Sequence, residues 1–174
     1  MKTLVILAHP NIQGSRVNQR LIQQVRNHPE ITVHELYSSY PDWIIDVPRE
    51  QELLETHDRI VFQFPLYWYS TPPLLKKWQD DVLTYGWAYG SQGKKLRGKE
   101  LLVATSIGGR QEVYQAGGRN HFTMSEILRP LQATSNMCGM TYLPAFVVEG
   151  ASDENQLAQA AIRYADRIRQ RTAS

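Results

Sequence analysis

The chain has 174 residues, of which 42% are hydrophobic and 21% are charged, which is typical of a folded globular protein and excludes an intrinsically disordered one. Its length predicts one domain over residues 1–174, and a net charge of only +2 with scattered basic residues argues against a nucleic-acid-binding surface. The single cysteine, Cys138, excludes an intrachain disulfide and a multi-cysteine metal site, and its surroundings predict a small buried side chain.

No apolar run approaches the roughly 20 residues that are needed to span a bilayer. The short apolar run at the start of the sequence ends at His9 and Pro10 without a cleavage site of small residues, so it does not resemble a signal peptide. We therefore expect a cytoplasmic protein, or one that a partner holds at the inner face of the cell membrane.

The first third of the chain alternates between strand and helix patterns. Residues 4–8 are continuously apolar, as expected for a strand that is covered on both faces. Ser15 can cap the helix that follows, whose apolar positions are Val17, Leu21, Ile22 and Val25. Residues 31–36 then predict a second strand, residues 50–55 a short helix, and residues 60–64 a third strand.

The next helix is expected to have Thr71 as its cap and Pro72 in its first turn, where no backbone N–H is needed. Its apolar stripe consists of Leu74, Leu75, Trp78, Val82 and Leu83. Residues 100–105 predict the fourth strand.

The last third of the chain continues the alternation. Residues 123–126 have the spacing of a capping box and open a helix, which Pro130 is expected to kink or break. Residues 141–148 predict a fifth strand with an irregular start at Pro144. A final helix is expected to open at residues 152–154, with acidic side chains at its positive end and a core stripe of Leu157, Ala161, Ala165 and Ile168.

This fivefold alternation predicts an α/β fold in which a parallel sheet has helices on both faces and right-handed crossovers. A five-stranded chain of this size most often adopts the flavodoxin-like three-layer sandwich with strand order 2-1-3-4-5. In that order the first, third and fourth strands are neighbours at the topological switch point. The loops that follow these three strands are therefore expected to meet.

The loop after the first strand ends where a helix begins. Gly14 permits unusual backbone angles, and Ser15 and Asn18 supply side-chain donors. Such a helix start favours phosphate, although simple capping by Ser15 explains the same residues. The glycine spacing matches neither the Walker A loop nor the dinucleotide-binding fingerprint, which counts against a nucleotide triphosphatase and a Rossmann domain.

The loop after the third strand carries three consecutive aromatic residues, Tyr67, Trp68 and Tyr69. Exposed aromatic residues at a strand end suggest a flat, partly apolar ligand. The backbone N–H groups of Leu66, Tyr67 and Trp68 are candidates to bind the polar edge of such a ring. As the alternative, Trp68 belongs to the core and Tyr69 to the ordinary surface.

In the loop after the fourth strand, Gly108 and Gly109 allow close approach of a planar ligand, or simply form a flexible turn. A phosphate at a helix start, a planar ring and an aromatic wall together fit a flavin nucleotide. Tyr114 and His121 follow as candidate proton-handling groups, with charged neighbours at Arg110, Glu112 and Arg119.

Several motifs combine along the chain: Leu7-Ala8-His9-Pro10 with Ser15 and Asn18, Phe64-Pro65-Leu66-Tyr67-Trp68-Tyr69 with Pro72-Pro73-Leu74-Leu75-Lys76, and Gly86-Trp87-Ala88-Tyr89-Gly90. They resemble the NAD(P)H:quinone oxidoreductase family with a flavodoxin-like fold. Two further stretches, residues 36–46 and 130–134, are similar to its small bacterial branch. That branch includes ancillary flavoproteins of glutathione-gated potassium-efflux systems and general-stress NAD(P)H oxidoreductases.

The resemblance implies a homodimer with one flavin per subunit, for which the short chain favours FMN and leaves FAD as the alternative. It implies that NAD(P)H and a quinone-like acceptor bind in turn at the same flavin face, in a ping-pong cycle. The cofactor-binding residues that it implies are His9, Ser15, Val17, Asn18, Pro65, Leu66, Tyr67, Trp68, Thr105, Ser106, Gly108 and Gly109.

The resemblance also suggests catalytic residues. Tyr114 matches the family tyrosine near the flavin pyrimidine edge, and His121 matches the relay histidine if one residue is inserted after Tyr114. Trp87 and Tyr89 are similar to residues that line the pocket of the other subunit, and Arg16 stands where the family varies.

The leading hypothesis is therefore a two-electron oxidoreductase that passes hydride from NAD(P)H through FMN to a quinone. The alternative is a regulatory subunit that activates a potassium-efflux membrane transporter. A one-electron carrier like flavodoxin is disfavoured, because such carriers are usually strongly acidic. We expect neither a metal ion nor a nucleic-acid partner.

Overall fold

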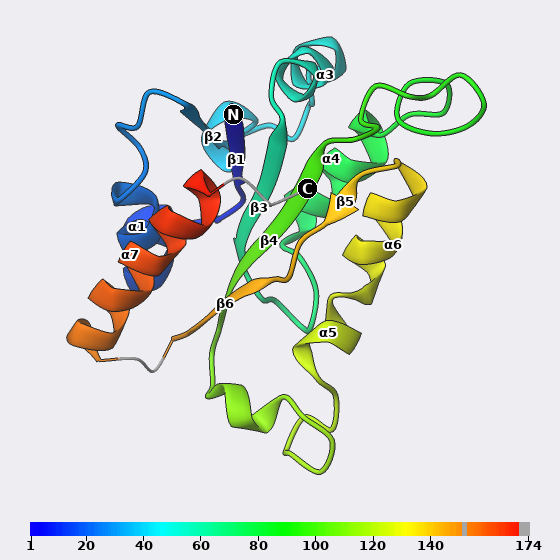
Figure 1. Cartoon of the computed structure of the whole chain (residues 1–174). Coiled ribbons are helices and arrows are strands. Elements are labelled where there is room, and N and C mark those ends of the chain that lie inside the picture. Colours follow the sequence, from blue (N-terminus) through cyan, green and yellow to red (C-terminus); the bar gives the residue numbers. More distant parts are fainter. Residues whose placement is uncertain (151–152, 171–174) are drawn as a thin grey trace.

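A parallel β-sheet forms the middle layer of the computed structural model, which describes residues 1–150 and 153–170 (Figure 1). Its strands are β1 (Thr3–Leu7), β2 (Ile31–Glu35), β3 (Arg59–Pro65), β4 (Glu100–Ile107), β5 (Thr141–Tyr142) and β6 (Phe146–Glu149). Hydrogen bonding orders them β2-β1-β3-β4-β5, with β6 also paired to β4, and all these pairs are parallel. The predicted order 2-1-3-4-5 is confirmed.

The segment that the sequence predicts as one strand over residues 141–148 is divided in two. β5 pairs with the start of β4, and β6 pairs with its end. Leu143 still donates its N–H to the Leu101 carbonyl at 2.8 Å, but Pro144 has no N–H with which to continue the ladder. The fifth position of the sheet is therefore occupied by two short strands in succession.

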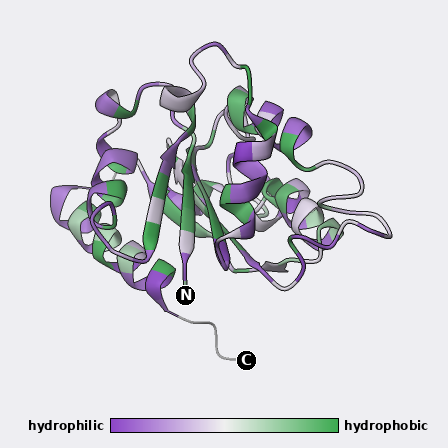
Figure 2. Ribbon diagram, turned by 90° about the horizontal axis from the view of Figure 1, so that it is seen from above, coloured by the Kyte–Doolittle hydropathy of each residue, from purple (hydrophilic) through white to green (hydrophobic). Residues whose placement is uncertain are grey.

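Helices cover both faces of this sheet. They are α1 (Arg16–Gln23), α2 (Leu36–Ser39), α3 (Val47–Glu55), α4 (Pro73–Val82), α5 (Met124–Ile127), α6 (Arg129–Met137) and α7 (Glu154–Arg169), with 3₁₀ turns η1 (Ile12–Gly14) and η2 (Gln111–Val113). Side chains of α1 and α7 join one apolar cluster, and those of α3, α4 and α6 join the other. Figure 2 shows hydrophobic residues, in green, concentrated on the strands and on the helix faces that point toward them.

Local sequence signals place most helix ends correctly. The Ser15 side chain accepts the Asn18 N–H, and Thr123 forms the predicted capping box with Glu126. Pro130 separates α5 from α6 and lies in the first turn of α6. The final helix begins after Asp153, whereas the predicted position Ser152 lies outside the described residues.

The predicted cap Thr71 is wrong, because α4 begins one residue later than expected. Pro72 occupies the cap position with φ −56° and ψ 148°, and no side chain caps the helix. A residue that precedes a proline is disfavoured in the helical region, and Pro73 imposes this restriction on Pro72. The pair of prolines therefore sets the helix start.

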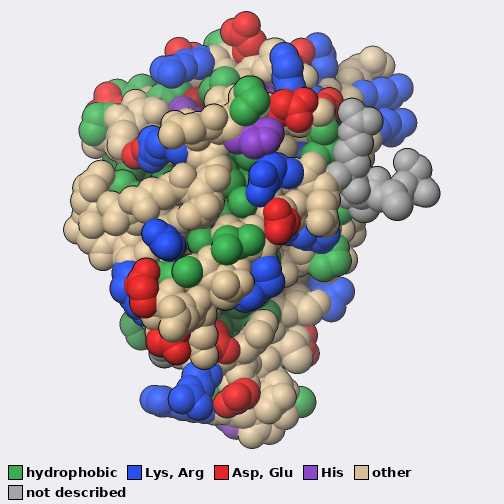
Figure 3. Space-filling view, turned by 60° about the vertical axis from the view of Figure 1, so that its left-hand side comes forward, with side chains coloured by type: hydrophobic (Ala, Val, Ile, Leu, Met, Phe, Trp, Pro, Cys, Tyr) green, Lys and Arg blue, Asp and Glu red, His purple; other side chains and the backbone are tan. Residues whose placement is uncertain are grey.

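The predicted core residues of the first and last helices are buried, as is Cys138, whose thiol pKa is raised by that burial. On the face shown in Figure 3, basic and acidic side chains are interspersed, without an extended patch of one sign. Among the residues that the structure describes, no helix is long and apolar enough to cross a membrane.

A buried carboxylate joins three elements on one side of the sheet. Glu50 is fully buried and accepts hydrogen bonds from Tyr40 Oη and from Trp78 Nε1 at 2.8 Å, while His34 Nε2 lies 2.9 Å from its Oε1. Burial alone raises the pKa of Glu50, but the hydrogen bond and charge of His34, with the other two donors, bring it below its ordinary value of 4.5.

A second buried group anchors the last helix. Arg59 is 1% exposed, donates through Nε to Glu100 Oε2 at 2.7 Å, and donates through its terminal nitrogens to the carbonyls of Arg167, Ile168 and Gln170. These carbonyls lie at the end of α7, where the helix itself offers them no N–H. Arg59 thus fixes α7 on the sheet.

Candidate functional site

A crevice of about 360 Å³ opens where the carboxyl ends of the central strands meet. Loops after β1, β3 and β4 line it, as the sequence predicts, and a fourth loop after β6 joins them. The lining residues are His9, Gly14, Ser15, Arg16, Val17, Pro65, Leu66, Tyr67, Ser106, Ile107, Gly108 and Gly150. Eight of the twelve predicted cofactor residues therefore line this one crevice. The four that do not line it are Asn18, Trp68, Thr105 and Gly109.

Asn18 lies behind the crevice and ties two of its loops together. The Asn18 side chain is buried, and its Nδ2 donates to Ser15 Oγ at 3.2 Å and to Ser106 Oγ at 2.9 Å. Both hydroxyls act as acceptors here, so each keeps its own hydrogen to donate to a ligand. Because Ser15 also takes the Asn18 N–H, the Val17 amide at the crevice has no acceptor in the described part of the chain.

The same end of the crevice carries a cation and a neutral imidazole. Arg16 donates to the Gly150 carbonyl at 3.2 Å and lies 3.7 Å from Glu154, so it bridges the first loop to the fourth. His9 accepts the Asn11 N–H through Nδ1 at 3.1 Å, and burial lowers its pKa. Neutral His9 therefore carries its proton on Nε2, from which it can donate. These donors suit an anionic group such as a phosphate.

The second loop makes a tight turn that corrects one expectation. Leu66 N–H donates to the Ser106 carbonyl at 2.8 Å, and Tyr67 N–H donates to the Ser70 carbonyl at 3.0 Å, so neither is free for a ring edge. Of the three predicted donors, only the Trp68 amide lacks an acceptor among the described residues.

Trp68 and Tyr69 form the middle of that turn with φ of 47° and 60°. Positive φ is uncommon for bulky residues and is found preferentially at functional sites. The Trp68 side chain is 93% exposed and does not line the crevice, so it belongs neither to the core nor to the crevice wall. The turn instead holds aromatic side chains in solvent beside the crevice.

Gly108 supplies an opening in the third loop. A β-carbon added there would meet no atom within 4 Å, and its φ lies outside the left-handed region. Neither packing nor backbone conformation demands glycine at this position, so the space before it is available to a ligand. Gly109 instead lies against Val113, and Thr105 is buried with no partner for its hydroxyl in the described chain.

The two predicted catalytic residues lie outside the crevice lining, in the segment that follows the third loop. Burial raises the pKa of Tyr114, the nearby Tyr69 raises it further, and a hydrogen bond with Asn120 opposes the rise. Tyr69 Oη also donates to Asn120 Oδ1 at 3.3 Å. Asn120 therefore stands between the two tyrosines, whereas His121 lines a neighbouring cavity.

Sequence reasoning missed Asn120 and Gly150. Asn120 stands where the resemblance implies the relay residue if no insertion follows Tyr114, so the spacing itself was the available signal. Gly150 donates to the Ile107 carbonyl at 2.7 Å, and a β-carbon on it would lie 2.9 Å from that oxygen. No local pattern indicates this contact, because it joins β4 to a loop more than 40 residues away.

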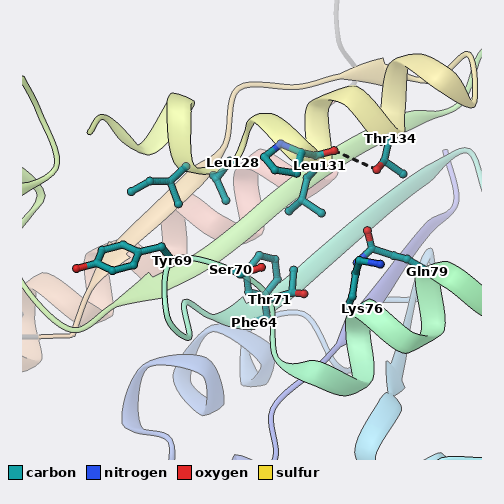
Figure 4. Close-up of a pocket in the computed structure, with 11 residues that line it drawn as sticks. Phe64, Tyr69, Ser70, Thr71, Lys76, Gln79, Leu128, Leu131 and Thr134 are labelled. Atoms are coloured by element: carbon teal, nitrogen blue, oxygen red, sulfur yellow. Dashed lines mark hydrogen bonds between the residues drawn. The ribbon is translucent and has the colours of Figure 1, made fainter. Parts of the chain in front are cut away.

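A smaller cavity of about 120 Å³ lies between α4 and the α5–α6 segment (Figure 4). Phe64, Leu128 and Leu131 contribute apolar walls, and Lys76 in its lining is paired with Asp80. Ligand sites for molecules of cofactor size usually enclose about 300 to 1,000 Å³. The crevice at the strand ends is therefore the better candidate for a flavin.

The crevice residues fit a flavin mononucleotide. Hydroxyl, imidazole, amide and guanidinium donors gather at one end, and an unfilled glycine position lies along the wall. The first set matches a phosphate, and the second matches a planar ring.

Comparison with known proteins identifies the family. The sequence model of the flavodoxin-like fold matches residues 1–171. The uncharacterized NAD(P)H oxidoreductase YrkL of Bacillus subtilis (strain 168) is 57% identical over 150 residues, which are 86% of each chain. The glutathione-regulated potassium-efflux system ancillary protein KefF of Klebsiella aerogenes is 41% identical over 167 residues, 95% of this chain and 93% of KefF.

Two solved structures are similar over nearly their whole length. General stress protein 14 from Treponema denticola, in complex with FMN, has a TM-score of 0.93 and 45% identity, covering 97% of this chain and 98% of that one. The NADPH-quinone reductase from P. pentosaceus has a TM-score of 0.91 and 36% identity, covering 99% and 100%. The chain therefore belongs to the family of proteins with a flavodoxin-like fold, in which these bacterial oxidoreductases are its relatives.

Proposed function

We propose that this protein is a flavin-dependent NAD(P)H:quinone oxidoreductase, in which NAD(P)H and a quinone-like acceptor use bound FMN in turn. The observation that carries the proposal is the crevice formed by loops after β1, β3 and β4, with its donor-rich end and the open space before Gly108. The FMN in the similar structure from Treponema denticola and the quinone reductase from P. pentosaceus support the same assignment.

FMN, when bound, supplies two-electron hydride chemistry, while the chain binds, orients and handles protons. We assign the phosphate to Ser15, the Val17 amide, His9 and Arg16, and the flavin ring to the Pro65–Trp68 and Ser106–Gly109 loops. Asn18 and buried Thr105 would act from behind these loops, by fixing them.

Tyr114 and His121 are proposed as the proton-handling groups. The raised pKa of Tyr114 keeps its phenol protonated at neutral pH, as a proton donor requires. Asn120 holds Tyr114 and Tyr69 in relation to each other, and His121 follows it directly in the chain. Proton exchange with solvent through His121 completes this arrangement.

The test is NAD(P)H oxidation by purified, FMN-loaded protein with a simple benzoquinone as acceptor. We expect turnover well above that of free FMN, and Tyr114→Phe should lower it about tenfold or more, since a positioned proton donor typically contributes roughly 100- to 10,000-fold. Tyr142→Phe is the matched control, because Tyr142 lies in β5 and outside the crevice. A rate equal to that of free FMN would refute the proposed function.

We also propose a homodimer. Trp43, Trp68, Tyr69, Tyr85 and Phe122 are between 40% and 93% exposed, and aromatic residues are enriched in protein–protein interfaces. Size-exclusion chromatography with light scattering should give twice the mass of the 20.0 kDa chain. A single-chain mass at micromolar concentration would contradict this proposal.

The relative KefF favours a second candidate function, that of a regulatory subunit for a potassium-efflux membrane transporter. A cytoplasmic location and a single domain, both of which we propose, suit either role. Affinity purification of the tagged chain from detergent-solubilised membranes distinguishes them. Recovery of an efflux transporter at stoichiometric yield favours the regulatory role, and its absence leaves the enzymatic one.

A further inference from the structure

A further cavity, of about 410 Å³, lies beside the aromatic turn of the second loop. Tyr69, Arg119, Asn120, His121, Phe122 and Ile127 line it. Tyr67, two residues before Tyr69 in the same turn, lines the crevice. The turn therefore lies between the two spaces, and a ligand that occupied both would cross it.

We infer that this cavity receives the adenosine end of the nicotinamide dinucleotide, and that Arg119 binds an adenosine 2′-phosphate and so makes NADPH the preferred donor. The inference rests on the proposed function, since it names which donor that function uses. It concerns a part of the molecule outside the flavin crevice.

The chemistry of the lining matches a phosphorylated purine nucleoside. Tyr69 and Phe122 are 52% and 59% exposed and present aromatic faces on which a purine can stack. Arg119 is exposed and makes no hydrogen bond or ion pair with the described residues. An uncommitted guanidinium is suited to bidentate binding of a phosphate.

The charge balance of the cavity discriminates between the two dinucleotides. In Rossmann domains, an acidic side chain binds the ribose 2′-hydroxyl of NAD and an arginine accommodates the 2′-phosphate of NADP, and the same pairing of charges applies to any site for these nucleotides. The described residues lining this cavity include Arg119 and His121 but neither Asp nor Glu. This set repels no phosphate and offers no carboxylate to a free 2′-hydroxyl.

The backbone around Arg119 is fixed before any ligand binds. Asn120 N–H donates to the Val113 carbonyl at 3.0 Å, and His121 N–H donates to the Gly118 carbonyl at 3.0 Å. A β-carbon on Gly118 would lie 2.8 Å from the Val113 carbonyl oxygen, so this turn depends on glycine. A preformed turn lowers the ordering cost when a ligand binds.

The experiment combines titration calorimetry with kinetics on FMN-loaded protein. Wild-type protein should bind 2′,5′-ADP about tenfold or more tightly than 5′-AMP, and Arg119→Gln should remove that difference. The ratio of kcat/KM for NADPH to that for NADH should fall about tenfold in Arg119→Gln. Arg110→Gln is the matched control, because Arg110 is exposed in the same segment but does not line the cavity.

An unchanged NADPH/NADH ratio in Arg119→Gln, or an equal fall in Arg110→Gln, would overturn the inference. Oxidation of neither dinucleotide would instead refute the proposed function. In that case the titration alone still tests whether the cavity binds a 2′-phosphate, because equal affinity for 2′,5′-ADP and 5′-AMP excludes such a subsite. Displacement of bound 2′,5′-ADP by a hydrophobic quinone alone, with no effect of Arg119→Gln, would assign the cavity to the acceptor and also overturn it.

Discussion

Replacement of Asn18 by alanine tests whether the loops of the crevice are held ready for the cofactor. Asn18 is 1% exposed, and its Nδ2 joins Ser15 in the first loop to Ser106 in the third. Gln63 Nε2 donates to the Asn18 backbone carbonyl at 3.0 Å, and this contact survives the substitution, whereas its longer contact with Asn18 Oδ1 at 3.5 Å is lost. The main perturbation is therefore to the tie between the two loops.

The expected magnitude follows from the two lost hydrogen bonds. Each contributes about 1 kcal/mol net, so Asn18→Ala should lower the free energy of unfolding by about 2 kcal/mol. In this variant, FMN must order loops that hydrogen bonds already hold in place in the wild-type protein. If the whole of this cost is transferred to binding, FMN affinity falls about 30-fold, and partial transfer gives a fall of about threefold or more.

Two measurements check this prediction. Urea unfolding of the apoprotein gives the stability change, and quenching of FMN fluorescence on titration gives the affinity. Asn155→Ala is the control, because Asn155 is exposed in the first turn of α7. An FMN affinity within twofold of wild type, in a variant that is destabilised as expected, would show that the tie supports the fold and not the binding site.

Three further changes probe the cofactor wall and the buried polar groups. Gly108→Ala should leave stability within about 0.5 kcal/mol but weaken FMN binding about tenfold, because its methyl group enters the open space; unchanged binding would remove the third loop from the site. Arg59→Met should cost about 3 kcal/mol in urea unfolding, with Arg163→Met on the exposed face of α7 as the control. Glu50→Gln should cost about 3 kcal/mol at neutral pH by leaving His34 without its carboxylate. The pKa of Glu50 is lower in the folded protein than in the unfolded chain, so the wild-type protein loses this stability as the pH falls through the folded pKa, below 4.5. The urea midpoints of the wild-type protein and Glu50→Gln should therefore converge at acidic pH. A constant difference between them would contradict this assignment.

Much of the fold follows from patterns that act over a few residues. A continuous apolar run predicted β1, hydroxyl caps predicted the starts at Ser15 and Thr123, and a ring without an N–H predicted the break at Pro130. Alternation of these elements then led to the strand order, because right-handed crossovers leave few arrangements for five such units. The start of α4 was missed by one residue, since Pro73 restricts Pro72 more strongly than Thr71 favours a cap.

The sequence predicted the three loops of the candidate site, and the tertiary structure decided how their groups are arranged. The strand order was enough to bring three loops together, whereas the fourth, at Gly150, entered because β6 runs beside β4. The Leu66 N–H donates to the Ser106 carbonyl and is not free for a ligand, and Asn120 lies between two tyrosines. The reason is that side-chain type and short-range spacing are written in the chain itself. Which donor remains free for a ligand depends on acceptors that distant strands and loops bring to it.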